Sequence, residues 1–213
     1  KNFKALVTAG PTREFIDPVR YITNRSSGKQ GYEIAKYLCK NGFKTTLITG
    51  PTKLENIKDV NILKVETAKE MYDATIENLP VDIAVFTAAV SDFKLKNSSN
   101  VKIKNTEMKD LKLEKNIDIL KHVSNHNSLR PKLVIGFAAE TNNINQNSKK
   151  KLVEKNCDWL ITNDVSNPEI GFDSDYNQVS IFYKDEKIEK LNKMKKSLVA
   201  NEIVKRVISN ING

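Results

Sequence analysis

Short apolar segments alternate with helical segments along most of this chain, and this alternation constrains the fold more than any other feature. The strand-like segments are rich in Val, Ile, Leu and Ala and span residues 4–9, 44–49, 61–65, 83–88, 133–138 and 159–162. Helical apolar spacing follows in residues 30–41, 68–78, 117–125, 145–156 and 195–208. Alternating strands and helices are typical of a mostly parallel sheet covered on both faces. We therefore predict a doubly wound α/β fold of the Rossmann-like type.

Local signals support the predicted element boundaries. Thr67 precedes a helix and Glu70 follows three residues later, which is the spacing of a capping box. Gly42 follows Asn41 at the end of another helix, where a glycine commonly ends the helical turns. Residues 83–88 are apolar except for Thr87, so we expect them to form a central strand that is buried on both faces.

One segment departs from the alternation. Residues 91–113 are rich in Lys and Asn, and Val101–Lys104 alternates like a strand with one side in solvent. We interpret this segment as a flap-like β excursion from the sheet, within a single domain that spans residues 1–213. Further along the chain, residues 177–183 and 187–191 have the pattern of a C-terminal β-hairpin.

The bulk composition excludes several classes of protein. With 213 residues and 39% hydrophobic content, the chain is long enough to bury one substantial core. No apolar run approaches the ~20 residues of a membrane span, so we expect no membrane association. Cys39 and Cys157 lie far apart without metal-ligand spacing, which favours two buried thiols in a reducing cytoplasm.

The formal net charge of +9 raises the question of a nucleic-acid partner. The lysines are scattered along the chain and often lie beside acidic residues, as in Lys184–Lys190. Such mixed runs are usually solvated surfaces, and neither an aromatic-rich RNA motif nor a zinc finger is present. We therefore expect no nucleic-acid binding, and a positive field of this size suits a small polyanionic substrate as well.

A long polar loop separates the first strand from the first helix. Residues 10–28 are rich in Gly, Pro, Ser, Thr and Asn, whereas strand-to-helix connections in such folds usually take only a few residues. Loops at the carboxyl ends of parallel strands are where ligands bind. Residues 24–28 also offer capping side chains and free N–H groups at a helix start, which suits a phosphate.

Polar clusters follow three further strands, at Ala88–Phe93, Gly136–Thr141 and Asn163–Val165. Any one of them alone is most simply an ordinary turn with capping side chains. A doubly wound sheet brings the carboxyl ends of its strands to one edge, so all four clusters together point to a site.

Standard nucleotide motifs are missing. The chain has no GxGxxG turn and no GxxxxGK[ST] loop, so the phosphates of a nucleotide would need other partners. Lys102, Lys151 and Lys155 are candidates, although the last two, four residues apart, also fit a solvated helix face. Asp92 suits either a cation or polar ligand group, or a simple turn.

The two histidines, His122 and His126, have the i, i+4 spacing of a metal-binding helix face. The pattern lacks the glutamate of an HExxH motif and an evident third ligand. We therefore favour an ordinary surface helix over a metal site.

Taken together, the motifs resemble one family over essentially the whole chain. They are the loop Gly10–Glu14 with Ile16–Arg20 and Ile22–Gly28, the clusters Ala88–Phe93, Gly136–Thr141 and Asn163–Val165, Lys102–Lys104, and Lys151 with Lys155. The resemblance is to the phosphopantothenoylcysteine synthetases, in the form fused behind a flavin-dependent phosphopantothenoylcysteine decarboxylase in bacterial bifunctional proteins. The chain begins at Lys1 rather than Met, so we expect it to be a piece of such a longer protein.

The resemblance implies a ligase of coenzyme A biosynthesis. It would join 4′-phosphopantothenate to L-cysteine with CTP and Mg²⁺, through an acyl-cytidylate, and release CMP and pyrophosphate. The resemblance also implies a homodimer and a cytoplasmic location. The metal would be held mainly by the CTP phosphates.

The same resemblance assigns roles to individual residues. Lys102 would serve formation of the acyl-cytidylate, whereas Asn24, Arg20 and Ala89 would serve the attack of cysteine. The implied CTP-binding residues are Ala88, Ala89, Val90, Asp92, Lys102, Ile117, Asp118, Ile119, Leu120, Phe137, Lys151 and Lys155. The implied phosphopantothenate-binding residues are Gly10, Asn24, Ser26, Ser27 and Gly28.

The chain departs from the family pattern at two places that bear on the site. Asn116-Ile117-Asp118 stands where the family usually has Asn-Pro-Asp, and Gln30 stands where Met is common. The alternative functions are a Rossmann-like NAD(P)-dependent oxidoreductase and a non-enzymatic, basic RNA-binding domain. The missing dinucleotide turn disfavours the first, and the scattered lysines disfavour the second.

Overall fold

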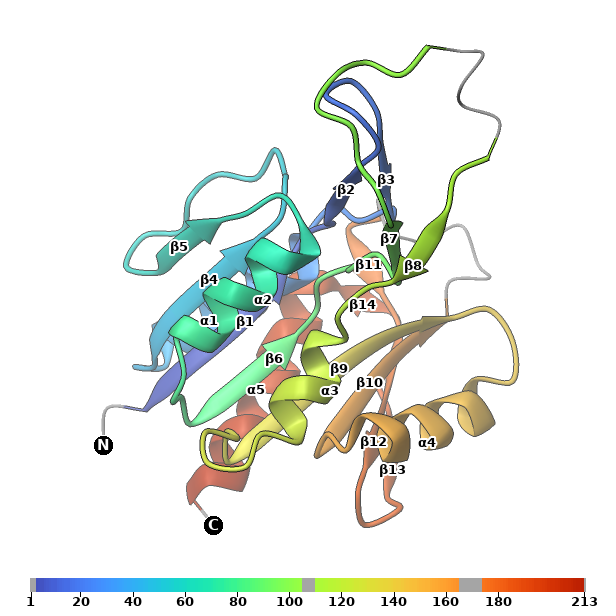
Figure 1. Ribbon diagram of the computed structural model, residues 1–213. Helices are drawn as coiled ribbons and strands as arrows, with labels where there is room; N and C mark the ends of the chain where they lie inside the picture. The colour runs from blue at the N-terminus through green and yellow to red at the C-terminus, as the bar shows by residue number, and fades with distance from the viewer. Residues whose placement is uncertain (1–2, 105–109, 165–173, 213) are drawn as a thin grey trace.

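The computed structural model describes residues 3–104, 110–164 and 174–212, and its centre is an eight-stranded sheet (Figure 1). The strand order is β13-β12-β10-β9-β6-β1-β4-β5. The six parallel strands are β1 (Lys4–Ala9), β4 (Lys44–Thr49), β5 (Asn61–Lys64), β6 (Ile83–Phe86), β9 (Leu133–Glu140) and β10 (Trp159–Asp164). The strands β12 (Val179–Tyr183) and β13 (Ile188–Lys190) continue the sheet antiparallel. The predicted doubly wound sheet and C-terminal hairpin are confirmed.

The order of the parallel strands places a crevice in the middle of the sheet. From β1 the chain builds outward through β4 to β5, and it then returns to the other side of β1 with β6, β9 and β10. If the six parallel strands are numbered in chain order and read across the sheet from β5 to β10, their order is 3-2-1-4-5-6, which is the Rossmann arrangement. The direction of winding changes between β1 and β6, where ligands bind in such folds. As predicted, β6 is central and all four of its residues are buried.

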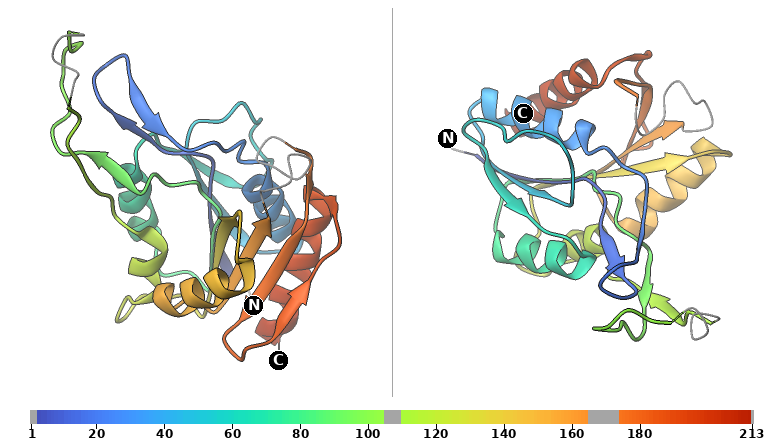
Figure 2. Two further views of the ribbon diagram at one scale, coloured as in Figure 1. Left: turned by 90° about the vertical axis from the view of Figure 1, so that its right-hand side faces the viewer. Right: turned by 90° about the horizontal axis from the view of Figure 1, so that it is seen from above.

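In the part of the chain that the structure describes, five helices cover the two faces of the sheet (Figure 2). Packed on one face are α1 (Lys29–Lys40) and α5 (Lys196–Asn212), and on the other α2 (Ala68–Glu77), α3 (Ile119–Ser124) and α4 (Ile144–Lys155). Alternate strand residues belong to different cores. In β1, Val7 packs with α1 and α5, whereas its neighbour Leu6 packs with the other helices. This period of two is what a sheet buried on both faces requires.

The predicted helix ends are present. The Thr67 hydroxyl accepts a hydrogen bond from the Glu70 amide at 3.2 Å, and the Glu70 carboxylate accepts one from the Glu66 amide at 2.9 Å. The arrangement is a capping box with one difference: the Glu70 carboxylate accepts from the amide of Glu66, which precedes the N-cap residue Thr67, and not from the amide of Thr67 itself. Gly42 has a φ of 85° directly after α1, which is the left-handed conformation that favours glycine there.

An arm projects from the carboxyl edge of the sheet. We define it as residues 11–23 together with the described residues of 91–115. Its first half is a hairpin of β2 (Arg13–Phe15) and β3 (Tyr21–Thr23), and its second half pairs β7 (Phe93–Leu95) with β8 (Leu113–Lys115). Figure 1 shows the two halves side by side. The predicted excursion from the sheet is thus present as a β ribbon.

One expectation about the arm was wrong, and one of its features was not expected. Val101–Lys104 forms no strand, although its residues alternate; the ladder lies at the base of the ribbon, where β7 meets β8. The β2–β3 hairpin was not predicted, because three-residue strands are too short for a clear alternating pattern. Residues 105–109 of the flap lie outside the described residues.

The thiols and the hydrophobic segments agree only partly with expectation. Cys157 is fully buried, and burial raises the pKa of its thiol to about 11. Cys39 is half-buried rather than buried, because it lies on the outer side of α1 with its thiol toward the Asp59 carbonyl. In the part of the chain that the structure describes, none of the helices is long and apolar enough to span a bilayer.

The opening loop crosses the end of β4 in direct backbone contact. A Cβ placed on Gly50 would lie 1.6 Å from the Pro11 carbonyl oxygen, so no side chain fits there. Pro11 in turn forms a parallel bridge with Ala89 beyond the end of β6. The loop therefore continues the ladder between β1 and β6 before it turns outward into the arm.

Substitution of Gly50 tests this contact. We expect Gly50→Ala to lower the free energy of unfolding by about 3 kcal/mol, at the upper end for an overpacked site, because backbone must move. Gly42→Ala is the comparison: it meets open space and carries only the cost of a left-handed alanine, roughly 1–2 kcal/mol. Urea unfolding measures both. Equal losses in the two variants would contradict the close approach.

Candidate active site

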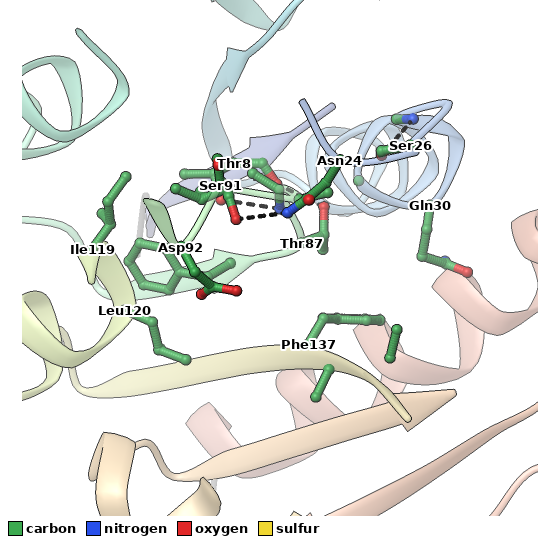
Figure 3. A pocket seen from close by; sticks show the side chains of 18 of the residues that line it. Thr8, Asn24, Ser26, Gln30, Thr87, Ser91, Asp92, Ile119, Leu120 and Phe137 are labelled. Atoms are coloured by element: carbon green, nitrogen blue, oxygen red, sulfur yellow. Dashed lines mark hydrogen bonds between the residues drawn. The ribbon is translucent and has the colours of Figure 1, made fainter. Parts of the chain in front are cut away.

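A cavity of about 910 Å³ opens at the carboxyl edge of the sheet, above the crevice between β1 and β6 (Figure 3). Its walls come from the opening loop, the loop after β6, the start of α3, the end of β9 and the helix α4. Members of all four predicted polar clusters line it, with Asn163 contributed by the last. Of the rest of that cluster, Asp164 is the last residue of β10, and Val165 lies outside the described residues.

One wall is the end of the opening loop. The Asn24 amide nitrogen donates a hydrogen bond to the Val90 carbonyl at 3.0 Å, which ties this loop to the loop after β6. The Ser26 hydroxyl accepts from the Gly28 amide at 3.2 Å. Gly28 itself is the N-cap of α1, with a φ of 76° and no side-chain cap. The expectation of capping side chains at this helix start was therefore wrong, because a left-handed glycine makes the turn.

The loop after β6 forms the floor. Ala88, Ala89 and Val90 line the cavity, and their backbone is held in place, since the Ala89 amide donates to the Gly10 carbonyl at 2.9 Å. The next residues are also fixed, since the Ser91 amide donates to the Thr12 hydroxyl at 3.0 Å. A rigid main-chain floor of this kind can present amides and carbonyls to a ligand in fixed directions.

Asp92 follows this floor and faces the same cavity as Asn24 and Phe137 (Figure 3). It is exposed, and among the described residues its carboxylate has no hydrogen-bond or ion-pair partner. Its backbone carbonyl accepts from the Asn116 amide at 2.8 Å, so the residue is held while its side chain stays available. The placement suits contact with a polar ligand better than a capping role.

The start of α3 supplies another part of the wall, with Ile117, Asp118, Ile119 and Leu120 all lining the cavity. Asp118 caps the helix, because its carboxylate accepts from the Lys121 amide at 3.0 Å. The Ile117 amide donates to the Asn116 side-chain oxygen at 3.0 Å. Proline, common at this position in the family that the sequence resembles, has no such N–H to donate.

Two of the lysines of α4, Lys151 and Lys155, reach the cavity from one face of the helix and are paired with carboxylates. The Lys151 ammonium lies 2.6 Å from Glu140, whose side chain is only 9% exposed and also accepts from Asn147 at 3.1 Å. Lys155 pairs with Asp118. These ion pairs hold both ammonium groups at the cavity rather than in bulk solvent.

The charge of the lining favours an anion. The cationic side chains are Arg25, Lys29, Lys115, Lys151, Lys155 and Lys196, and the anionic ones are Asp92 and Asp118. This excess of positive charge in a concave site attracts polyanions. Among the described residues, no cluster of three His, Cys, Asp or Glu side chains could hold a metal ion. The Asp92 carboxylate suits Mg²⁺ that is shared with substrate phosphates, which is how that ion is commonly held.

Three of the residues assigned by resemblance do not line the cavity. Gly10 lies beneath Gly28, where its backbone supports the helix start. Arg20 and Lys102 lie on the arm, Arg20 half-buried and Lys102 exposed. The other assigned residues of the chain all line the cavity: Asn24, Ser26, Ser27, Gly28, Ala88, Ala89, Val90, Asp92, Ile117, Asp118, Ile119, Leu120, Phe137, Lys151 and Lys155.

Sequence reasoning missed the wall formed by Gln30, Asn177 and Lys196. The Asn177 amide donates to the Gln30 side-chain oxygen at 3.2 Å, and the Gln30 amide donates to the Lys196 carbonyl at 3.2 Å. The amide of Gln30 thus serves both partners, which a methionine could not do. No local pattern signals a contact between segments 147 residues apart.

The two histidines serve packing and turn formation. His122 Nε2 lies 3.1 Å from the Tyr72 hydroxyl, and His126 Nδ1 accepts from the Leu129 amide at 3.1 Å. These contacts agree with an ordinary surface helix.

A Rossmann-like sheet with a cationic cavity at its topological switch point defines a class of α/β domains that bind anionic ligands at the strand ends. Within that class, the chain belongs to the family described as the DNA/pantothenate metabolism flavoprotein C-terminal domain, whose model matches residues 1–211.

Similar proteins include the coenzyme A biosynthesis bifunctional protein CoaBC of Borreliella burgdorferi, 44% identical over 209 residues, which are 96% of this chain and 52% of that protein. The CoaBC of Haemophilus influenzae is 42% identical over 94% of this chain and 51% of its own length. The chain therefore spans about half the length of these relatives. A crystal structure of a CoaBC C-terminal domain matches with a TM-score of 0.82 and 37% identity, over 100% of this chain and 97% of that one.

The double role of Asp118 can be separated by substitution. Asp118→Asn keeps an N-cap and removes the charge pair with Lys155, so we expect it to lower the free energy of unfolding by less than about 0.5 kcal/mol, as for other part-exposed pairs. Asp118→Ala removes the cap as well and should cost about 1 kcal/mol more. Thermal or urea unfolding distinguishes the two. Equal effects would contradict the capping geometry.

Proposed function

We propose that this chain is the synthetase domain that ligates 4′-phosphopantothenate to L-cysteine with CTP in coenzyme A biosynthesis. The observation that carries the proposal is the single cationic cavity in which Asn24–Gly28 meet Asp92, Phe137 and the lysines of α4. The 37% identity to a CoaBC C-terminal domain over its whole length supports the same assignment. We propose further that residues 1–213 act as one domain.

In the proposed first half-reaction, the carboxylate of phosphopantothenate attacks the α-phosphorus of CTP. Pyrophosphate leaves and an acyl-cytidylate forms. Asp92, Phe137 and the backbone of Ala88–Val90 are placed to hold the nucleoside, and Lys151 and Lys155 to meet its phosphates or base edge. When bound, Mg²⁺ would neutralise negative charge on the phosphates, and Asp92 would be the carboxylate at the cavity that could contact it. Lys102 is assigned to this half by resemblance.

In the proposed second half-reaction, the amino group of cysteine attacks the acyl carbonyl, and CMP leaves. We assign the orientation of the acyl group to Asn24, because it lines the cavity beside Val90 and its side-chain amide both donates and accepts hydrogen bonds. Ala89 lies beside it in the floor, and Arg20 is assigned to this half by resemblance. The phosphate of phosphopantothenate would lie at Ser26–Gly28, where the amides of the first turn of α1 have no side-chain cap.

We also propose a homodimer, and the surface of the arm supports it. Of the eleven large apolar side chains exposed among the described residues, seven lie on the arm: Phe15, Val19, Tyr21, Phe93, Val101, Leu111 and Leu113. Apolar surface gathered on one projection favours a protein interface. In the longer protein, a flavin-dependent decarboxylase would precede this domain. CTP and cysteine are cytoplasmic metabolites, so we expect the reaction there.

Pyrophosphate release tests the function. The chain should release pyrophosphate only when phosphopantothenate, CTP and Mg²⁺ are all present, and should form phosphopantothenoylcysteine when cysteine is added. ATP in place of CTP is the nucleotide control. No pyrophosphate with either nucleotide would overturn the proposal. Turnover that requires NAD(P)H, or salt-sensitive RNA binding without turnover, would support the alternative functions instead.

The two half-reactions should fail separately in two variants. Asn24→Asp should form acyl-cytidylate and little final product, whereas Lys102→Gln should fail before the intermediate, each with a loss of about 100-fold or more. Lys104→Gln is a matched control, since it removes the same charge two residues away on the exposed flap. Mass spectrometry of quenched reactions detects the intermediate. Normal product formation by Asn24→Asp would refute its assignment to the cysteine step.

A further inference from the structure

The arm contains a buried carboxylate that the proposed reaction does not use. Asp17 lies in the turn between β2 and β3, and its side chain is 0% exposed. It accepts hydrogen bonds from the amides of Val19 and Arg20, both at 2.9 Å, and from Nε and Nη2 of Arg20. It also accepts from the Ile103 amide at 3.1 Å.

Asp17 and Arg20 together hold the backbone of Ile103 at two points. The Ile103 amide donates to Asp17, and the Ile103 carbonyl accepts from Arg20 Nη2 at 2.7 Å. The ion pair therefore satisfies both backbone groups of one flap residue, as a neighbouring strand would. A second bond, from the Ser99 amide to the Ile16 carbonyl at 3.0 Å, joins the same two halves of the arm.

A purely local role does not account for this arrangement. An aspartate that only stabilised its own turn would need the amides of Val19 and Arg20 and nothing more. The bonds to Ile103 cross 86 residues of chain and reach a stretch without regular secondary structure. Hydrogen bonds to a charged group are stronger than neutral ones, and the guanidinium of Arg20 keeps the pKa of Asp17 well below its ordinary value. The carboxylate is thus charged at neutral pH.

We propose that Asp17 is a positioning residue of the ligase, which acts through Arg20 to fix the flap backbone at Ile103 and so the point from which Lys102 extends. This inference rests on the proposed function only for the role of Lys102. We call the two hydrogen bonds that join Asp17 and Arg20 to the Ile103 backbone the grip. They involve no side-chain atom of Ile103, so they fix the position of the backbone and leave the neighbouring side chains free. The bonds described occupy Nε and Nη2 of Arg20, which leaves its Nη1 donors for a ligand.

Hydrogen exchange tests the grip without reference to any reaction. In Asp17→Asn, the Ile103 amide loses its charged acceptor, and we expect its exchange to become at least about tenfold faster in the free protein. The matched control is Asp110→Asn, which removes the same charge from an exposed position on the other limb of the flap. Its Ile103 exchange should equal that of the unsubstituted chain.

Steady-state kinetics then tests the positioning role. Because the cavity walls are untouched, Asp17→Asn should keep the KM for CTP within about threefold while kcat falls by roughly 10- to 100-fold, the effect of a misplaced catalytic group. Asp110→Asn should keep both constants. A second variant, Ile103→Pro, removes the flap N–H with Asp17 and Arg20 intact, and we expect the same loss of kcat.

Faster exchange at Ile103 together with the selective loss of kcat would support the proposal. Unchanged exchange in a folded Asp17→Asn, unchanged kcat despite faster exchange, or a raised KM with normal kcat would each overturn it. If Asp17→Asn does not fold, Ile103→Pro decides: a normal kcat refutes the proposal and a lowered one supports it. If the unsubstituted chain releases no pyrophosphate, the proposed function fails, and exchange at Ile103 still reports whether the grip exists.

Discussion

The site depends on how closely the opening loop and the start of α1 approach the ends of the strands. At these points a glycine leaves no room for a side chain. Gly50 lies against the Pro11 carbonyl, and a Cβ on Gly31 would lie 2.3 Å from the Thr87 hydroxyl. The bridge between Pro11 and Ala89 extends the ladder of β1 and β6 past the sheet. Because the loop is pinned there, it can project an arm outward and still return to begin α1 at the edge of the cavity.

The charged side chains that line the cavity determine which ligands it favours. The cavity holds more cationic than anionic side chains, which favours a polyanion, and both α4 lysines that line it, Lys151 and Lys155, are already paired with a carboxylate. Of the two carboxylates, Glu140 is the more buried. It also accepts a hydrogen bond from Asn147, which lies on α4 with Lys151, so this ion pair is held between β9 and α4. A nucleotide entering the cavity meets ammonium groups that are held in place, so less side-chain entropy is lost on binding than with mobile lysines.

The sequence predicted the sheet, its central strand, the helices and the capping box, because each depends on a local period or on residues three apart. The convergence of Asn24, Asp92 and Phe137 was predictable as well, since parallel strands bring their carboxyl ends together. Lys151 lies in α4, and only the resemblance assigned it to the site. The Gln30–Asn177 contact and the hold of Asp17 on Ile103 were not predictable. They join segments 147 and 86 residues apart, and side-chain bonds of that kind leave no periodic trace in one sequence. The short strands of the arm were missed for a related reason, since three residues cannot establish a period.

We propose that one cavity holds the nucleotide near Asp92 and the phosphorylated acid near Ser26. A crystal structure of the chain with CTP and phosphopantothenate tests this placement. We expect the cytidine beside Asp92 and Phe137, its triphosphate toward Lys151 and Lys155, and the second phosphate at Ser26–Gly28. Either ligand bound away from this cavity, or the two in exchanged positions, would refute the placement.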